Sequence, residues 1–201
     1  MTLFLVALNV VAFVLELGDF ERIINVFALW PPASASVAGA PPFHVWQIVS
    51  YSLLHANTPH LLFNMLGLYM FGREIELALG RARLAMLYVA SVVAGALMQL
   101  LVLAVSRPLG YPTVGASAGV FGLLLTYAVL FPRRRVVLLF PPIPMPAWIF
   151  ATGYAILELA LGVSGTQAGV AHFAHLGGML GALVCLAYWY WRARASRRHV
   201  D

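Results

Sequence analysis

The sequence contains no lysine, a single cysteine and few charged residues of any kind. Charged residues make up 9% of the 201 residues, whereas roughly a quarter is usual in a soluble domain. Hydrophobic residues make up 62%, and the mean hydropathy is +0.90. The composition therefore argues against a water-soluble fold and predicts a polytopic membrane protein that lies within a lipid bilayer.

The scarce residue types also argue against several classes of function. Cys185 has no partner for an intramolecular disulfide, and its apolar surroundings disfavour the reactive thiolate. The net charge of +5 comes from arginine alone, which in a membrane protein indicates topology and only weakly nucleic-acid binding, so we expect no nucleic-acid partner. The N-terminal apolar run lacks a preceding basic segment and a clear cleavage site, so we expect a first span there and not a signal peptide.

Long, unbroken apolar runs predict an all-α fold, because a membrane barrel would show short segments of alternating hydrophobicity. A helix needs about 20 apolar residues to cross the hydrocarbon core. We expect one membrane domain over residues 1–201, with a long first loop over 18–50 and a rigid proline turn at 140–146. The six expected spans cover residues 2–17, 58–78, 82–105, 115–131, 146–163 and 169–191.

The arginines predict the orientation of these spans. Most of them lie at 73–83, 133–135 and 192–198, three places that share one side of the membrane if there are six spans. The positive-inside rule then places both termini in the cytoplasm. The second, fourth and sixth spans consequently begin together on the opposite side, so residues near their starts share one depth.

Polar residues stand near the starts of these same three spans, and each is a functional hypothesis because polar groups are costly in lipid. His60 and Asn64 lie four residues apart on one face of the second span. Ser117 opens the fourth span within the run TVGASAGVFG, and His172 and His175 open the sixth. A serine, imidazoles and an amide are therefore expected to meet at one depth.

Serine with histidine is the minimal pair for nucleophilic acyl transfer, in which the imidazole takes the hydroxyl proton and returns it to the leaving amine. The tetrahedral oxyanion needs donors, which the Asn64 amide, a second imidazole and the N–H groups that begin the fourth span can supply. The carboxylates inside spans, Glu16 and Glu158, do not fall near these span starts by sequence. We therefore expect a Ser–His dyad without a carboxylate.

Other interpretations of the same residues stay open at this point. A serine flanked by glycine and alanine suits close helix packing, and His172 with His175 suits interhelical hydrogen bonding. Together with His55 and His60 these histidines could bind zinc, but no HExxH motif and no acidic residue at ligand spacing accompanies them, so we expect no metal. Buried ionisable residues also mark ion paths, although no inverted repeat supports a transporter.

Three motifs follow one another on the second, fourth and sixth expected spans: HLLFN (60–64), GASAG (115–119) and AHLGG (174–178). In this order they resemble the motifs of the rhomboid family of intramembrane serine proteases, in its minimal six-helix bacterial type. The resemblance implies a six-helix rhomboid-like bundle with a Ser117–His175 dyad, in which Ser117 is the nucleophile and His175 the general base.

The resemblance also implies supporting residues. His60 and Asn64 match the family's oxyanion-binding positions, and Gly115 and Ala116 lie beside the nucleophile in the same substrate-binding turn. The remaining matches are Gly178 after the base, His55 before the second helix, and Glu76 and Gly80 at that helix's end.

Two positions differ from many family members. A Trp-Arg pair of the first loop is here Trp46-Gln47, which bears on how that loop is anchored. The tyrosine often found four residues after the nucleophile is here Phe121, whose ring can still stack against the catalytic histidine.

The function implied by the resemblance is hydrolysis of peptide bonds in or near the transmembrane segments of other proteins. Substrates would enter between the second and fifth spans, beneath the connection 106–114, and no cofactor is required. The expected location is the inner membrane of a bacterium. A catalytically inactive, rhomboid-like protein that binds membrane clients is the alternative.

Overall fold

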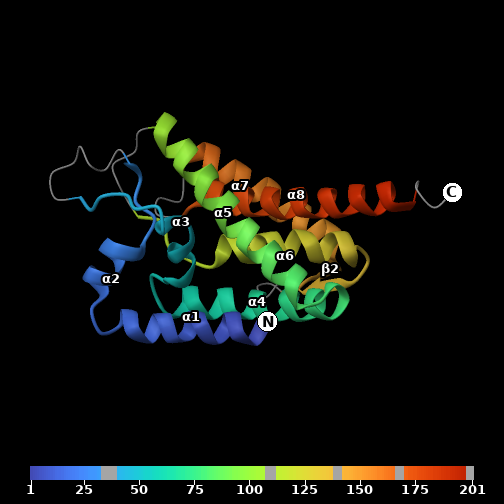
Figure 1. The fold of residues 1–201 in the computed structure, drawn as a ribbon, viewed down its shortest axis with the longest axis horizontal. Coiled ribbons are helices and arrows are strands. Elements are labelled where there is room, and N and C mark those ends of the chain that lie inside the picture. Colours follow the sequence, from blue (N-terminus) through green and yellow to red (C-terminus); the bar gives the residue numbers. More distant parts are fainter. Residues whose placement is uncertain (33–39, 107–111, 138–141, 166–169, 198–201) are drawn as a thin grey trace.

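The computed structural model describes residues 1–32, 40–106, 112–137, 142–165 and 170–197. It confirms an all-α bundle of apolar helices, with one small two-stranded sheet (Figure 1). The elements in chain order are α1 (Thr2–Glu16), α2 (Phe20–Phe27), α3 (Gln47–Ser50), a 3₁₀ turn (Tyr51–Leu53), α4 (Thr58–Leu79), α5 (Arg81–Ser106), α6 (Ser117–Leu130), β1 (Arg135–Val137), β2 (Pro144–Pro146), α7 (Ala147–Ser164) and α8 (His172–Arg197).

The six expected spans correspond to α1, α4, α5, α6, α7 and α8. Among the described residues, α5, α7 and α8 are long and apolar enough to cross a membrane, and α1 and α6 are shorter apolar helices. At 1.5 Å per residue, the 14 residues of α6 extend about 21 Å, less than the roughly 30 Å of the hydrocarbon core. Because α6 packs against α4, α5, α7 and α8, its first residue, Ser117, lies inside the bundle.

The close approach of α6 and α8 depends on glycine. A Cβ at Gly178 of α8 would collide with the backbone carbonyl of Ala118 in α6. The backbones of the two helices are therefore in direct contact one residue beyond Ser117. This confirms that the small residues pack the fourth expected span against the sixth, and the same packing brings the start of α6 to the start of α8.

Two connections contain elements that the sequence analysis did not predict. The first loop contains α2 and α3. The proline-rich stretch expected to form a turn ends in β2, whose Met145 pairs antiparallel with Val136 of β1. Prolines are tolerated there because both strands of a two-stranded sheet are edge strands. Residues 140–141 and 107–111, parts of the expected turn and of the connection above the site, lie outside the described residues.

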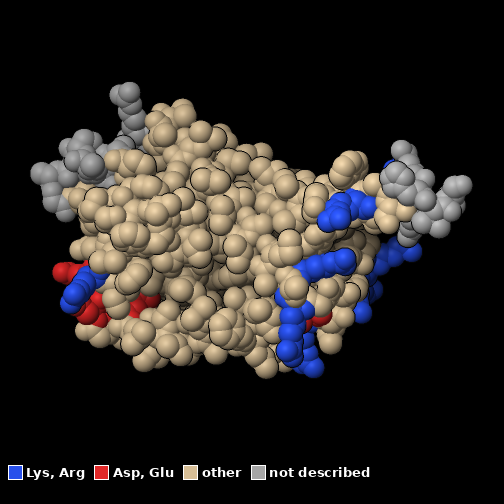
Figure 2. All heavy atoms as spheres, viewed as in Figure 1, with Lys and Arg blue, Asp and Glu red and all other residues tan. Residues whose placement is uncertain are grey.

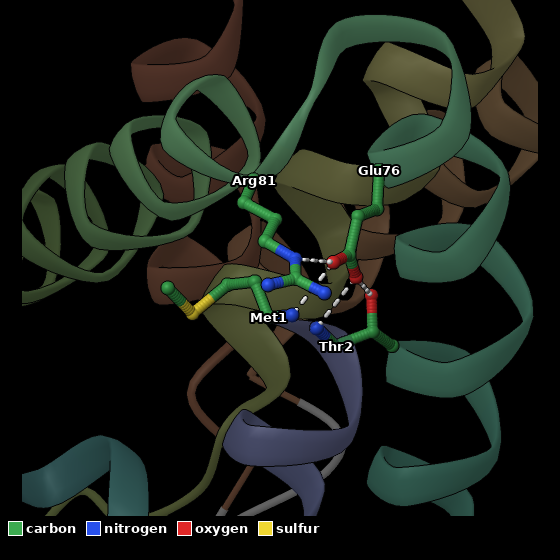
Figure 3. Close-up of polar contacts among 4 residues, drawn as sticks. All are labelled: Met1, Thr2, Glu76 and Arg81. Carbon is green, nitrogen blue, oxygen red and sulfur yellow. Dashed lines mark hydrogen bonds and ion pairs between the residues drawn. The ribbon is translucent and has the colours of Figure 1, made fainter.

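Glu76, near the end of α4, contacts the start of α1 and the start of α5 (Figure 3). Its carboxylate accepts hydrogen bonds from the Met1 amine at 2.6 Å and from the Thr2 hydroxyl at 2.7 Å, and it lies 3.3 Å from Nε of Arg81. Glu76, one of the positions that match the family resemblance, thus has a structural role.

Most arginines visible in Figure 2 gather at one end of the molecule, beside the last turns of α8. The opposite end carries acidic side chains with a smaller basic group. The grouping agrees with one arginine-rich membrane side, and the assignment of that side to the cytoplasm stays a prediction.

Candidate active site

Ser117 and His175 are hydrogen-bonded to each other, with 2.8 Å between Ser117 Oγ and His175 Nε2. The serine is the first residue of α6 and the histidine lies in the first turn of α8, 58 residues further along the chain. His175 is 8% exposed, and Ser117 is half-buried and lines a cavity. The meeting of the fourth and sixth expected spans at these two side chains is confirmed.

Gly115 shapes the turn that presents Ser117. Its φ of 123° is a conformation that residues with a Cβ rarely adopt, and a Cβ there would lie 2.8 Å from the His60 ring. Its N–H donates to the Tyr51 carbonyl at 2.9 Å. Gly115 thus contributes its conformation, while the N–H groups of the first turn of α6, which have no partner within their own helix, remain for an oxyanion. Ala116, fully buried, is the residue that precedes this helix.

Phe121 stacks on the imidazole of His175, with ring centroids 4.4 Å apart and planes 4° from parallel. Tyr154 of α7 packs edge-on against Phe121, with ring centroids 5.9 Å apart. The prediction that phenylalanine preserves the stacking is confirmed. The stacked ring limits the rotation of the histidine side chain and holds Nε2 toward the serine.

Glu158 of α7 lies beside both histidines, contrary to the expectation that no carboxylate reaches them. Its Oε2 is hydrogen-bonded to His172 Nδ1 at 2.6 Å and lies 2.9 Å from His175 Nδ1. The His172 contact has hydrogen-bond geometry, whereas the His175 contact does not. The expectation was wrong because it rested on the starts of the second, fourth and sixth spans and did not include the end of the fifth. The last turns of α7 lie at the same depth, since α7 runs antiparallel to α8.

His172 is hydrogen-bonded to Glu158, whereas the imidazole that is hydrogen-bonded to Ser117 is that of His175. Ligand atoms of Glu158, His172 and His175 lie within 4.8 Å of one another, a set different from the four histidines considered for zinc. The contacts of 2.6 and 2.9 Å are shorter than the roughly 3.3 Å between two ligands of a tetrahedral zinc ion. They fit hydrogen bonding and ion pairing better than a preformed metal site.

His60 and Asn64 come from the first two turns of α4, as expected. Asn57 caps this helix by accepting the His60 backbone N–H at 2.8 Å, and His60 then lies against Gly115. Asn64 is 6% exposed, and its amide donates to the His60 carbonyl at 2.9 Å. Both residues line the same cavity as Ser117, so the second expected span joins the other two at this depth.

His55 stands behind His60, with ring centroids 5.1 Å apart. It is 1% exposed, and its backbone N–H donates to Glu16 Oε2 at 3.1 Å. Burial, together with the nearby His60, lowers the pKa of His55 to about 4, so that this imidazole is neutral at physiological pH. Among the described residues that line the cavity beside Ser117, His60 is included and His55 is not, so the buried His55 ring supports His60 from behind.

Gln47 anchors the first loop, a function that the sequence alone did not reveal. The side chain is completely buried; its Oε1 accepts the N–H groups of Trp30 and His44, each at 3.2 Å, and its Nε2 donates to the Val26 carbonyl at 3.2 Å. The neighbouring Trp46 stacks on His44. A neutral amide can satisfy donors and acceptors at once, so glutamine holds three parts of the loop without an arginine.

A cavity of about 1290 Å³ opens beside Ser117 and His175. Its walls include Phe63 and Met70 of α4 and Phe150 and Tyr154 of α7, so it lies between these two helices. Most of the lining is apolar, and the polar groups concentrate at the site. An apolar cavity with a few convergent polar groups is typical of a binding site.

The chain was compared with known proteins. The Rhomboid domain matches residues 42–192. The chain is 33% identical to Rhomboid protein 1, mitochondrial, of Saccharomyces cerevisiae over 68% of this chain and 40% of that protein. It is 37% identical to the putative rhomboid protease YdcA of Bacillus subtilis over 45% of both, and 30% identical to rhomboid protease AarA of Providencia stuartii over 71% of this chain and 56% of that protein.

The chain thus covers less than two thirds of each of these relatives. The domain match nevertheless spans all the residues that meet at the cavity, from the anchored first loop to α8. Together with the apolar helical bundle, it shows that this membrane protein belongs to the rhomboid family.

Proposed function

We propose that this chain is an intramembrane serine endopeptidase that hydrolyses peptide bonds in or near transmembrane segments of other membrane proteins. The observation that carries the proposal is the 2.8 Å contact between Ser117 Oγ and His175 Nε2 beside an apolar cavity. Several relatives are named rhomboid proteases, which supports the same reaction class. We place the protein in a bacterial inner membrane, although its relatives also include mitochondrial proteins.

The reaction begins when Ser117 Oγ attacks the scissile carbonyl carbon and His175 Nε2 takes the hydroxyl proton. The carbonyl oxygen becomes an oxyanion, for which His60, the Asn64 amide and the N–H groups at the start of α6 are the donors. The C–N bond then breaks, and the imidazolium returns its proton to the leaving amine. Water hydrolyses the resulting ester by the same route, with His175 again acting as base.

The substrate enters from the side, between α4 and α7, because the cavity lies there. A transmembrane helix hides its carbonyl groups in i to i−4 hydrogen bonds, so the segment must unwind before Ser117 can reach one. Glycine or proline near the cleaved bond weakens the helix and lowers this cost. We therefore expect preferred substrates to carry such residues near the cut, with a small residue before it.

The test is cleavage of a single-pass substrate by the purified protein in liposomes, with Ser117→Ala as the comparison. Cleavage by the wild-type chain and none by Ser117→Ala is the expected result. Cleavage that persists in Ser117→Ala would contradict the assignment of the nucleophile. Substrate binding without cleavage by the wild-type chain would favour an inactive client-binding protein.

A further inference from the structure

Glu158 is a buried carboxylate in an otherwise apolar helix. It is 6% exposed and lies on α7, whose sequence AWIFATGYAILELALGVS contains no other charged residue. A carboxylate at such a place is costly unless it is hydrogen-bonded or paired with a cation. The Ser117–His175 pair needs no carboxylate to exchange a proton, so the location of Glu158 calls for a separate explanation.

One oxygen of this carboxylate lies close to two imidazole rings, and in each ring the nearest nitrogen is Nδ1. Oε2 lies 2.6 Å from Nδ1 of His172 and 2.9 Å from Nδ1 of His175. An ionised carboxylate only accepts hydrogen bonds, so it favours a proton on each Nδ1. A neutral imidazole with its proton on Nδ1 has an unprotonated Nε2. For His175 this is the form that can take the proton of Ser117, 2.8 Å away.

We infer that Glu158 is a positioning residue, which holds His175 in the tautomer that accepts the serine proton and stabilises the imidazolium that then forms. The inference rests on the proposed function and extends its Ser–His pair by a carboxylate from α7. Glu158 stays ionised throughout; the proton moves from Ser117 Oγ to His175 Nε2 and on to the leaving amine, and Nδ1 keeps its own.

His172 has its own part in this arrangement. Its bond to Glu158 is the better aligned of the two, so it fixes the carboxylate beside His175. The helices come close at this level, since a Cβ on Gly162 of α7 would lie 3.2 Å from Cβ of His172 and 3.0 Å from the Phe173 ring. The carboxylate is therefore held by packing and by one firm hydrogen bond, and acts on His175 mainly through its charge.

The experiment compares Glu158→Gln with the wild-type chain in liposomes across a range of pH. Glutamine keeps the size but loses the charge, and its amide can donate to Nδ1, which favours the wrong tautomer. We expect the maximal cleavage rate to fall, by at most about 10⁴-fold, which is the upper end of the contribution of a positioned general base. The acidic limb of the pH profile moves to lower pH, because the imidazolium has lost the anion that stabilised it.

The groups that face His175 from the surrounding helices are Ser117 of α6, His60 of α4, and Glu158 of α7, with His172 on its own helix. Glu16→Gln is the matched control, because it removes an equally buried carboxylate whose bond goes to a backbone N–H. We expect Glu16→Gln to show the same acidic limb in the pH profile of cleavage as the wild-type chain. A shift in Glu158→Gln that Glu16→Gln reproduces would overturn the inference.

A second readout does not depend on activity. Nitrogen NMR of histidine-labelled protein reports which ring nitrogen carries the proton, and we expect Nδ1–H at His175 in the wild-type chain and Nε2–H in Glu158→Gln. The same tautomer and the same pH profile in both proteins would overturn the inference. Absence of Ser117-dependent cleavage by the wild-type chain would instead overturn the proposed function, with the tautomer still measurable.

If Glu158→Gln does not fold, Glu158→Asp decides the question. Aspartate keeps the charge but is shorter by one methylene, so we expect the acidic limb to stay in place while the rate falls. An Nε2–H tautomer at His175 in this folded variant, which retains the negative charge, would overturn the inference.

Discussion

Glu16 and Glu158 are both carboxylates buried in apolar helices, yet they bond to different kinds of group. Glu16, 1% exposed, accepts the backbone N–H of His55 at 3.1 Å. Glu158, 6% exposed, faces imidazole nitrogens of His172 and His175. A bond to the backbone fixes the path of the chain, whereas a bond to an imidazole fixes where a proton resides. Equal burial therefore does not imply equal roles.

Asn64 tests whether a side chain that bonds to the backbone can also take part in the reaction. Its amide donates to the His60 carbonyl, a backbone bond like that of Glu16, yet its side chain lines the cavity beside Ser117. If it turns to the oxyanion during the reaction, Asn64→Ala lowers the cleavage rate by roughly 10- to 1,000-fold, as expected for one donor among several. The rate constant of substrate cleavage at saturation measures the effect. An unchanged rate would make Asn64 purely structural.

Glu16→Ala sharpens the comparison from the structural side. The variant leaves the His55 N–H buried without its partner, which costs about 1–3 kcal/mol of stability. Unfolding in mixed detergent micelles measures this loss, and the cleavage rate per folded molecule stays at the wild-type value. Wild-type stability in Glu16→Ala would show that the bond to the His55 N–H contributes nothing to stability. An altered pH profile of cleavage would show that Glu16, like Glu158, acts on the catalytic histidine.

Phe121 gives the smallest expected effect, since it touches the histidine without bonding to it. Phe121→Leu loses the stacking on His175, a contact worth about 0.5–1.5 kcal/mol, so we expect a roughly two- to tenfold lower rate. Phe121→Tyr keeps the ring and serves as the control with nearly the wild-type rate. Equal rates for the leucine and tyrosine variants would exclude a role for stacking.

Sequence reasoning predicted the apolar helices and the meeting of Ser117 with His175, because motif order and span polarity fix which helix ends share a depth. It missed Glu158, which lies six residues before the end of α7, about 9 Å along the helix axis. Because α7 runs antiparallel to α8, its last turns lie beside the first turns of α8, and this would have placed Glu158 near the first turn of α8. Rotation about the helix axis, which decides whether it faces His175 or lipid, depends on packing that sequence does not give.

Two further features could not be predicted from the sequence, because they also depend on how distant segments pack together. Gln47 satisfies backbone groups at Val26, Trp30 and His44, and such contacts form only once the loop has folded. The pairing of β1 with β2 joins two short segments with little strand character, and their register follows from the helices that they connect. Local pattern therefore predicts elements better than it predicts the polar contacts between them.

The most direct test of the account is covalent labelling of the wild-type chain with a fluorophosphonate probe, followed by mass spectrometry of its peptides. An activated serine reacts with such a probe, whereas an ordinary buried serine does not. The account predicts a single modified peptide with the probe on Ser117, and no modification in a folded His175→Ala variant. Wild-type protein that stays unmodified at Ser117, or equal labelling of Ser117 in both proteins, would contradict it.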